Sequence, residues 1–123
     1  MKTVLVVEDH EANRRLVTRF LTREGYNVLV AEDGLQGVAL ALSDQPDMIL
    51  MDLDLPELDG WEATRRIKAN PETKHIPVVA LTSHAFPDDV AKARKAGCDG
   101  YETKPIVYSR LMQRVEQILR GGA

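Results

Sequence analysis

The chain has 123 residues, of which 44% are hydrophobic and 28% are charged, and its formal net charge is −3. This length suits one domain of ordinary size with a buried core, so we expect a single domain over residues 1–123. The one cysteine, Cys98, excludes an intramolecular disulfide framework. The 16 basic residues are spread along the chain, whereas a nucleic-acid footprint needs them clustered. We therefore expect no nucleic-acid partner.

The first apolar run covers residues 4–7 and ends at two acidic residues. It is too short for the core of a signal peptide or for a membrane span. We therefore expect a cytoplasmic protein without a membrane partner.

Short apolar runs then alternate with longer segments of helical spacing. The runs predict strands at residues 4–7, 28–31, 48–51 and 78–81, with a weaker and more polar strand near Tyr101. The expected apolar faces of the intervening helices are Ala12, Leu16, Phe20 and Leu21, then Leu35, Val38, Ala39 and Leu42, then Trp61, Ala63 and Ile67, and finally Val107, Leu111, Val115 and Ile118.

The residues at the expected helix ends agree with this alternation. Gly25 and Gly97 are expected just past the ends of the first and fourth helices. Asp59, with Glu62 three residues later, resembles a capping box at the start of the third helix. Pro87 suits a first helical turn, where its missing N–H would have no partner in any case.

Strands separated by helices predict parallel pairing with right-handed crossovers. The fold class is therefore α/β, a doubly wound five-stranded parallel sheet with five helices. We take the strand order 2-1-3-4-5 from flavodoxin-like folds rather than from this sequence. The uniformly apolar runs at 4–7 and 48–51 are expected in the centre of the sheet, because strands covered on both faces are apolar throughout. The polar last strand is expected at an edge.

Chemically active side chains stand where these strands end. The first strand ends in Glu8 and Asp9, the third in Asp52, the fourth in Thr82 and Ser83, and the fifth is followed by Lys104. In doubly wound sheets ligands bind beyond the carboxyl ends of the strands, so we expect these groups to meet there.

Three clustered carboxylates need neutralisation. At roughly 4–5 Å and an effective dielectric constant of about 20, two carboxylates repel each other by roughly 3–4 kcal/mol. Lys104 supplies one positive charge, and Mg²⁺ suits the remaining oxygen ligands. We expect Asp9 and Asp52 to bind the ion directly, and Glu8 directly or through water.

A carboxylate beside Mg²⁺ can attack phosphorus and form an aspartyl phosphate. Such a transfer needs in-line positioning and neutralisation of the phosphoryl oxygens, which Mg²⁺, Lys104 and the Thr82 hydroxyl can provide. Asp52 is the preferred nucleophile, because it ends a central strand between the other groups.

Five segments, in order, resemble a CheY-like response regulator receiver domain over the whole chain. They are the opening strand with Glu8 and Asp9, residues 46–56 followed by Asp59 and Gly60, residues 76–82, residues 96–101, and Lys104 with Pro105. Each segment alone is a weak signal, but together, with this spacing, they are highly specific.

The resemblance implies a role for each matching residue. Asp52 would be the phosphoacceptor, and Glu8, Asp9, Asp52 and the backbone carbonyl of Asp54 would hold Mg²⁺. Further implied roles are phosphoryl binding and switching by Thr82, Ser83, Lys104 and Tyr101, a cis peptide bond before Pro105, and tuning of the reaction rates by Asp54 and His84.

The resemblance also implies partners. The phosphoryl donor would be a phosphohistidine on a sensor histidine kinase or a histidine phosphotransfer domain, docking near Asn13, Leu16, Pro56 and Pro105. A target protein would bind the fourth helix, fifth strand and fifth helix. We expect a stand-alone receiver that signals through protein contacts or passes the phosphoryl group on. Beyond its own phosphorylation and dephosphorylation, it is expected not to be an enzyme.

Three alternatives remain open. Asp52-Leu53-Asp54 resembles the Asp-x-Asp of haloacid-dehalogenase-like phosphatases, although that motif normally follows the first strand. A flavin-binding flavodoxin-like protein would need a phosphate loop after the first strand, where this chain has acids. A degenerate receiver used only for binding is disfavoured by the complete set of acids, hydroxyl and lysine.

Several conspicuous residues have simpler interpretations. Their spacing matches no metal motif, so His10, His75 and His84 are expected to be surface histidines. The pairs Arg14-Arg15 and Arg65-Arg66 are expected on solvated helix faces. Cys98 and Trp61 are interpreted mainly as packing residues.

Overall fold

The computed structural model describes residues 1–55, 58–83 and 87–120, and within them five parallel strands alternate with five helices. The strand order is β2-β1-β3-β4-β5. In chain order the elements are β1 (Thr3–Val7), α1 (Glu11–Arg23), β2 (Asn27–Ala31), α2 (Gly34–Asp44), β3 (Met48–Asp52), α3 (Gly60–Ala69), β4 (Val78–Thr82), α4 (Pro87–Ala96), β5 (Gly100–Thr103) and α5 (Tyr108–Leu119). The predicted fold class and strand order are confirmed.

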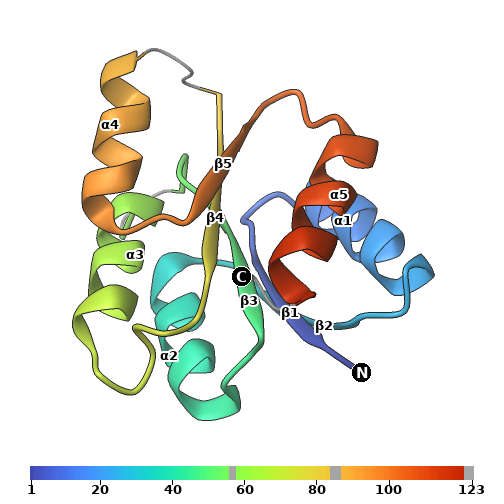
Figure 1. Ribbon diagram of the computed structural model, residues 1–123, viewed down its shortest axis with the longest axis horizontal. Coiled ribbons are helices and arrows are strands. Elements are labelled where there is room, and N and C mark those ends of the chain that lie inside the picture. Colours follow the sequence, from blue (N-terminus) through green and yellow to red (C-terminus); the bar gives the residue numbers. More distant parts are fainter. Residues whose placement is uncertain (56–57, 84–86, 121–123) are drawn as a thin grey trace.

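Helices cover both faces of the sheet (Figure 1). On one face, Val17 and Leu21 of α1 and Leu111 and Val115 of α5 pack in one apolar cluster with alternate strand residues. On the other face, α2 and α3 pack against the opposite strand residues, and α4 lies beside α3 (Figure 1). Because β3 and β4 are buried along their whole length, their sequences are apolar runs rather than alternating patterns.

The register of the sheet aligns the carboxyl ends of its strands. Val7 pairs with Met51, Asp52 pairs with Leu81, and Thr82 pairs with Thr103. The residues that follow β1, β3, β4 and β5 therefore emerge at the same edge, where a doubly wound sheet binds its ligands.

The expected apolar face of α1 is partly wrong. The helix buries Val17 and Leu21, whereas Leu16 is 40% exposed and Ala12 is also exposed. Phe20 is partly buried and stacks on the ring of Tyr108 in α5, with the ring centroids 4.5 Å apart. Residues 17 and 21 have the same four-residue spacing as 12, 16 and 20, so the position of α5 and the sheet decides which row is buried.

The expected face of α2 is also partly wrong. Val38 packs against the core, but Leu35 and Leu42 are 57% and 44% exposed, and the buried residues are Gly34, Gly37 and Ala41. A Cβ atom at residue 37 would lie 2.8 Å from a methyl carbon of Val7, so the helix approaches the sheet more closely than a larger residue would permit. A helix face that packs through glycine shows no hydrophobic residues in the sequence, so the hydropathy pattern pointed to the wrong residues of α2.

The predicted helix ends are confirmed. Gly25 and Gly97 have φ angles of 91° and 103°, in the left-handed region that glycine adopts without strain. The Asp59 side chain caps α3 by accepting a hydrogen bond from the backbone N–H of Glu62 at 2.9 Å, and α4 begins at Pro87. Every helix in residues 1–55, 58–83 and 87–120 falls short of the length and apolar character that a membrane span requires.

Candidate functional site

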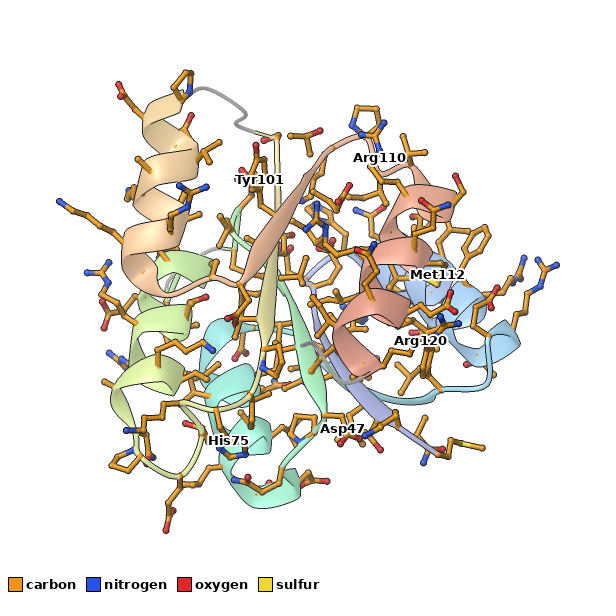
Figure 2. All side chains as sticks on the ribbon, viewed as in Figure 1. Asp47, His75, Tyr101, Arg110, Met112 and Arg120 are labelled. Carbon is orange, nitrogen blue, oxygen red and sulfur yellow. The ribbon has the colours of Figure 1, made fainter. Side chains whose placement is uncertain are left out.

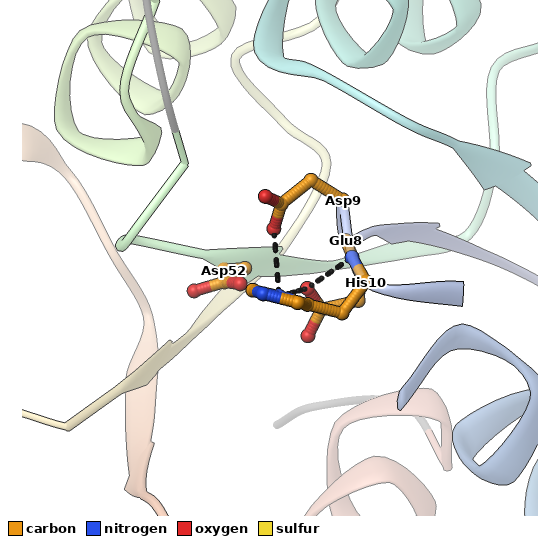
Figure 3. A group of neighbouring side chains, drawn as sticks. All are labelled: Glu8, Asp9, His10 and Asp52. Atoms are coloured by element: carbon orange, nitrogen blue, oxygen red, sulfur yellow. Dashed lines mark hydrogen bonds and ion pairs between the residues drawn. The ribbon is translucent and has the colours of Figure 1, made fainter. Parts of the chain in front are cut away.

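Four acidic or imidazole side chains converge at the carboxyl edge of the sheet (Figure 3). Glu8, Asp9 and His10 follow β1, and Asp52 is the last residue of β3. One ligand atom from each lies within 4.8 Å of all the others. The structure thus brings the three predicted carboxylates together and adds His10, which the sequence analysis treated as a surface residue.

Asp52 is fully buried and its two carboxylate oxygens differ in environment. Its Oδ1 accepts hydrogen bonds from the Lys104 ammonium at 2.9 Å and from the backbone N–H of Asp54 at 2.8 Å. Its Oδ2 is buried without a hydrogen-bond partner among the described residues. Since a buried polar oxygen without a partner costs about 1–3 kcal/mol, this oxygen is suited to an incoming cation or electrophile.

Lys104 balances part of the negative charge. Its ammonium is 2.9 Å from Asp52 Oδ1 and 3.5 Å from Asp54 Oδ2. Burial alone would lower its pKa, but the hydrogen bond and charge of Asp52, with the charges of Glu8 and Asp54, raise the pKa of Lys104 above its usual value. The group is therefore positively charged at neutral pH. The peptide bond between Lys104 and Pro105 is cis, as expected.

The pKa of Glu8 indicates that the single charge of Lys104 does not neutralise the carboxylate cluster. Its side chain is buried, and burial together with the neighbouring carboxylate of Asp52 raises the pKa of Glu8 to about 7. The backbone N–H of His10 opposes this rise by donating a hydrogen bond to Glu8 Oε2 at 3.1 Å. In the absence of a further cation, the cluster therefore keeps a proton that an isolated glutamate would lose.

The oxygen donors and the charge of this cluster fit a hard divalent cation. Glu8, Asp9 and Asp52 would hold Mg²⁺, which prefers carboxylate oxygens and keeps several waters. The buried Oδ2 of Asp52, without a hydrogen-bond partner among the described residues, and the raised pKa of Glu8 both fit a cation at this point.

Arg14 contacts the backbone of the site. Its side chain is only 15% exposed, and its Nη1 donates to the backbone carbonyls of Glu8 at 3.1 Å and Asp9 at 3.0 Å. Its Nη2 is 3.4 Å from a carboxylate oxygen of Glu32. The expectation of a solvated face is therefore wrong for Arg14, because its guanidinium folds back over the loop that carries Glu8 and Asp9, and it is right for Arg15, whose side chain is 80% exposed. The sequence did contain a signal for this contact, because Arg14 lies one turn into the helix that follows Glu8 and Asp9.

The hydroxyl residues lie on the other side of Asp52. Thr82 is buried, and its carbonyl accepts a hydrogen bond from the backbone N–H of Lys104 at 2.8 Å. The N–H and hydroxyl of Ser83 donate to Asp54 Oδ2 at 3.2 and 3.0 Å. Asp54 therefore links the ends of β3 and β4 beside the carboxylate of Asp52. The predicted rate-tuning residue His84 and the predicted docking residue Pro56 lie outside the described residues.

Tyr101 lies on β5 between α4 and α5 (Figure 2). Its ring is half-buried and packs against the cluster beneath α2 and α3. It also lines a hollow of about 200 Å³, together with Val90, Arg94 and Arg114. The tyrosine thus joins the core to the surface formed by α4, β5 and α5.

Gly60 lets α3 lie close to the end of β3. A Cβ atom at this position would lie 2.3 Å from the carbonyl oxygen of Asp52 and 2.6 Å from the Cα atom of Leu53. No side chain fits there without moving the backbone, so the glycine after the Asp59 cap allows the helix to pack against the backbone of Asp52 and Leu53.

Of the remaining residues singled out in the sequence, Cys98 is half-buried and packs against the core. Burial raises the pKa of its thiol, which favours the unreactive protonated form. Trp61 packs on the same cluster, with the Lys92 ammonium 4.7 Å from its ring centroid. Arg65 and Arg66 lie near Glu62 on a solvated face, as expected.

A buried carboxylate, the acids Glu8 and Asp9 and a lysine thus meet at the carboxyl edge of a 2-1-3-4-5 sheet. The response regulator receiver domain family matches residues 4–116. The chain belongs to this family.

Individual relatives agree over nearly their full length. The chain is 38% identical over 118 residues to the polar-differentiation response regulator DivK of Brucella anthropi, covering 96% of each chain. It is also similar to the receiver domain of the sensor histidine kinase PA1611 from Pseudomonas aeruginosa, at 34% identity, a TM-score of 0.90 and 98% coverage of each chain. That structure has a magnesium ion coordinated in its active-site cleft. Chemotaxis protein CheY4 of Vibrio cholerae is 27% identical with a TM-score of 0.90, over 96% of this chain and 98% of its own.

Proposed function

We propose that this chain is a response regulator that accepts a phosphoryl group on Asp52 in a Mg²⁺-dependent reaction. The observation that carries the proposal is the buried, unpartnered Oδ2 of Asp52 among Glu8, Asp9 and Lys104. As a two-component receiver, the chain would take the phosphoryl group from a phosphohistidine on a sensor histidine kinase or a histidine phosphotransfer domain.

In the transfer, an oxygen of Asp52 forms a bond to phosphorus while the phosphorus–nitrogen bond of the donor breaks. The electron pair of the broken bond leaves with the donor imidazole, which takes up a proton. Bound Mg²⁺ would neutralise charge on the phosphoryl oxygens. Lys104 already contacts Asp52 Oδ1, so it holds the carboxylate and lies beside the phosphoryl oxygens of the product.

Thr82 and Ser83 would complete the phosphoryl-binding groups. Thr82 ends β4 and Ser83 follows it, next to Asp52, and a new bond from Thr82 to a phosphoryl oxygen would draw this strand end inward. Tyr101 on β5 would then turn into the released space and report the change on the face of α4, β5 and α5. Asp54, with His84, would tune the rates of phosphoryl entry and hydrolysis, because its carboxylate borders the acceptor.

The output would run through protein contacts, either with a target on the α4-β5-α5 face or by passing the phosphoryl group onward. Only its own phosphorylation and dephosphorylation would be catalysed. A cytoplasmic location is proposed with this function, since two-component phosphotransfer uses intracellular donors. Steady turnover of small phosphate esters would instead favour the phosphatase alternative.

The test is intact-mass measurement after incubation with acetyl phosphate and Mg²⁺. Wild type is expected to gain one phosphoryl adduct that EDTA prevents and Asp52→Asn abolishes. Asp44→Asn, which changes an exposed carboxylate at the end of α2, serves as the matched control and is expected to keep the adduct. Lys104→Ala is expected to form it more slowly.

A wild-type protein that stays unmodified should next be offered a phosphorylated histidine phosphotransfer domain, because small donors are poor substrates for some receivers. If the folded protein takes no phosphoryl group from that donor either, the proposal is wrong. An adduct that persists in Asp52→Asn would move the acceptor to another residue.

A further inference from the structure

His10 lies at the exposed side of the carboxylate cluster, with its Nδ1 directed toward the carboxylates. Its side chain is 68% exposed, yet its Nδ1 is 3.2 Å from Asp9 Oδ1 and 3.4 Å from Glu8 Oε2. Figure 3 shows the imidazole between these two carboxylates, with Asp52 beside it. The nitrogen is thus placed where it can either donate to these carboxylates or share a cation with them.

Two contacts of His10 have the spacing of neighbouring metal ligands. Around an ion with bonds of about 2.1 Å, neighbouring ligands are roughly 3.0 Å apart in an octahedral shell and roughly 3.4 Å apart in a tetrahedral one. His10 Nδ1 is 3.2 and 3.4 Å from its two carboxylate neighbours, and one ligand atom from each of the four side chains lies within 4.8 Å of the others. The imidazole can therefore become a ligand when the wider pairs of the cluster contract around an ion.

An imidazole changes which ions such a site prefers. Mg²⁺ takes oxygen ligands and gains little from a ring nitrogen, whereas imidazole suits Zn²⁺, Ni²⁺, Cu²⁺ and Fe²⁺. We propose that His10 is an additional metal ligand, so that the acceptor site binds first-row transition-metal dications, Zn²⁺ and Co²⁺ among them, in preference to Mg²⁺.

The proposal rests on the proposed function in one respect, because it takes Glu8, Asp9 and Asp52 to be the Mg²⁺ ligands. It then adds a form of regulation. With these three carboxylates and His10 bound, a tetrahedral ion such as Zn²⁺ has no coordination position left for a phosphoryl oxygen. Zn²⁺ is therefore expected to compete with Mg²⁺ and to inhibit phosphorylation of Asp52.

A different role for His10 predicts the opposite result. If its Nδ1–H only donates hydrogen bonds to Asp9 and Glu8, the ring must be displaced when any ion binds. Its removal would then strengthen the binding of Mg²⁺ and Zn²⁺ alike. A ligand role predicts weaker Zn²⁺ binding with Mg²⁺ binding unchanged.

The deciding experiment is calorimetric titration of wild type, His10→Phe and His75→Phe with MgCl₂, CoCl₂ and ZnCl₂. His75 is an exposed histidine before β4, at the opposite end of the sheet from the site (Figure 2), and controls for adventitious imidazole binding. His10→Phe is expected to weaken Co²⁺ and Zn²⁺ binding at least about tenfold, by analogy with losses at tuned metal sites. Mg²⁺ affinity should change less than about threefold, and His75→Phe should match wild type.

A second readout observes the ligand directly. On Zn²⁺ addition, the nitrogen chemical shift of His10 Nδ1 is expected to move as coordination replaces its proton, and in the Co²⁺ form the visible absorption of His10→Phe is expected to differ from that of wild type. Equal metal preferences in wild type and His10→Phe, or tighter binding of both ions by the variant, would overturn the proposal. Mg²⁺ binding and phosphorylation of Asp52 would still stand in that case, whereas loss of all divalent-ion binding in wild type would also remove the proposed function.

Discussion

The raised pKa of Glu8 predicts how the metal-free protein responds to pH. An unfolded glutamate titrates near 4.5, but in the folded protein the pKa of Glu8 is about 7 because the side chain is buried beside Asp52. Between these values the folded state holds a proton that the unfolded state has released. Folding stability is therefore lost as the pH rises from about 4.5 to about 7, and the loss ends when both states are ionised.

The size of the effect follows from the shift. One pKa unit corresponds to about 1.4 kcal/mol, so the change from 4.5 to about 7 amounts to at most roughly 3.5 kcal/mol. Glu8→Gln resembles the protonated side chain and lacks this titration. In EDTA, the variant and wild type are expected to be similarly stable near pH 4.5, and the variant to be more stable by up to that amount near pH 8.

The assay is urea unfolding followed by Trp61 fluorescence at several pH values, with and without Mg²⁺. The difference between wild type and Glu8→Gln isolates Glu8 from the other titrating groups. Saturating Mg²⁺ should reverse the difference near pH 8, because an ion bound by the folded state stabilises the ionised wild-type cluster. Parallel stability curves for the two proteins across pH 4.5–8 in EDTA would refute the argument that burial among carboxylates holds a proton on Glu8.

Three further substitutions test the geometry around the site. Arg14→Ala removes both hydrogen bonds to the carbonyls of the acid pair and is expected to weaken Mg²⁺ binding about tenfold by calorimetry; if the exposed neighbour Arg15→Ala has the same effect, the cause is bulk charge. Gly60→Ala is expected to destabilise the protein by about 1–3 kcal/mol in urea unfolding, and unchanged stability would show that α3 shifts freely. Leu21→Ala is expected to cost about 2–5 kcal/mol and Leu16→Ala less than about 1 kcal/mol, and equal losses would contradict the observed face of α1.

The sequence predicted the strands and the carboxylates at their ends for one physical reason. A strand buried on both faces must be apolar along its whole length, so the apolar runs before Glu8 and Asp52 could be recognised as strands from the sequence. The polar residue that ends each run then lies at the carboxyl edge by the geometry of parallel crossovers alone. Gly25, Gly97 and Pro87 marked helix ends because their backbone constraints are local.

The helix faces could not be predicted in the same way. On α1 the rows containing Leu16 and Leu21 have similar spacing, and the choice between them depends on α5 and the sheet, which lie far away in the sequence. On α2 the buried row contains Gly34 and Gly37, whose contribution is the absence of a side chain. Hydropathy measures the side chains that are present and cannot register a close approach that depends on having none.

Local pattern and strand order are enough to predict the alternation of strands and helices and to bring Glu8, Asp9, Asp52, Thr82 and Lys104 to one edge of the sheet. That the His10 ring and the Arg14 guanidinium lie beside these groups could be seen only in the folded protein. Both follow the acid pair closely, but their side chains are long or free to rotate, and the field of several converging carboxylates and carbonyls directs them inward. That field exists only once distant strands have brought their ends together.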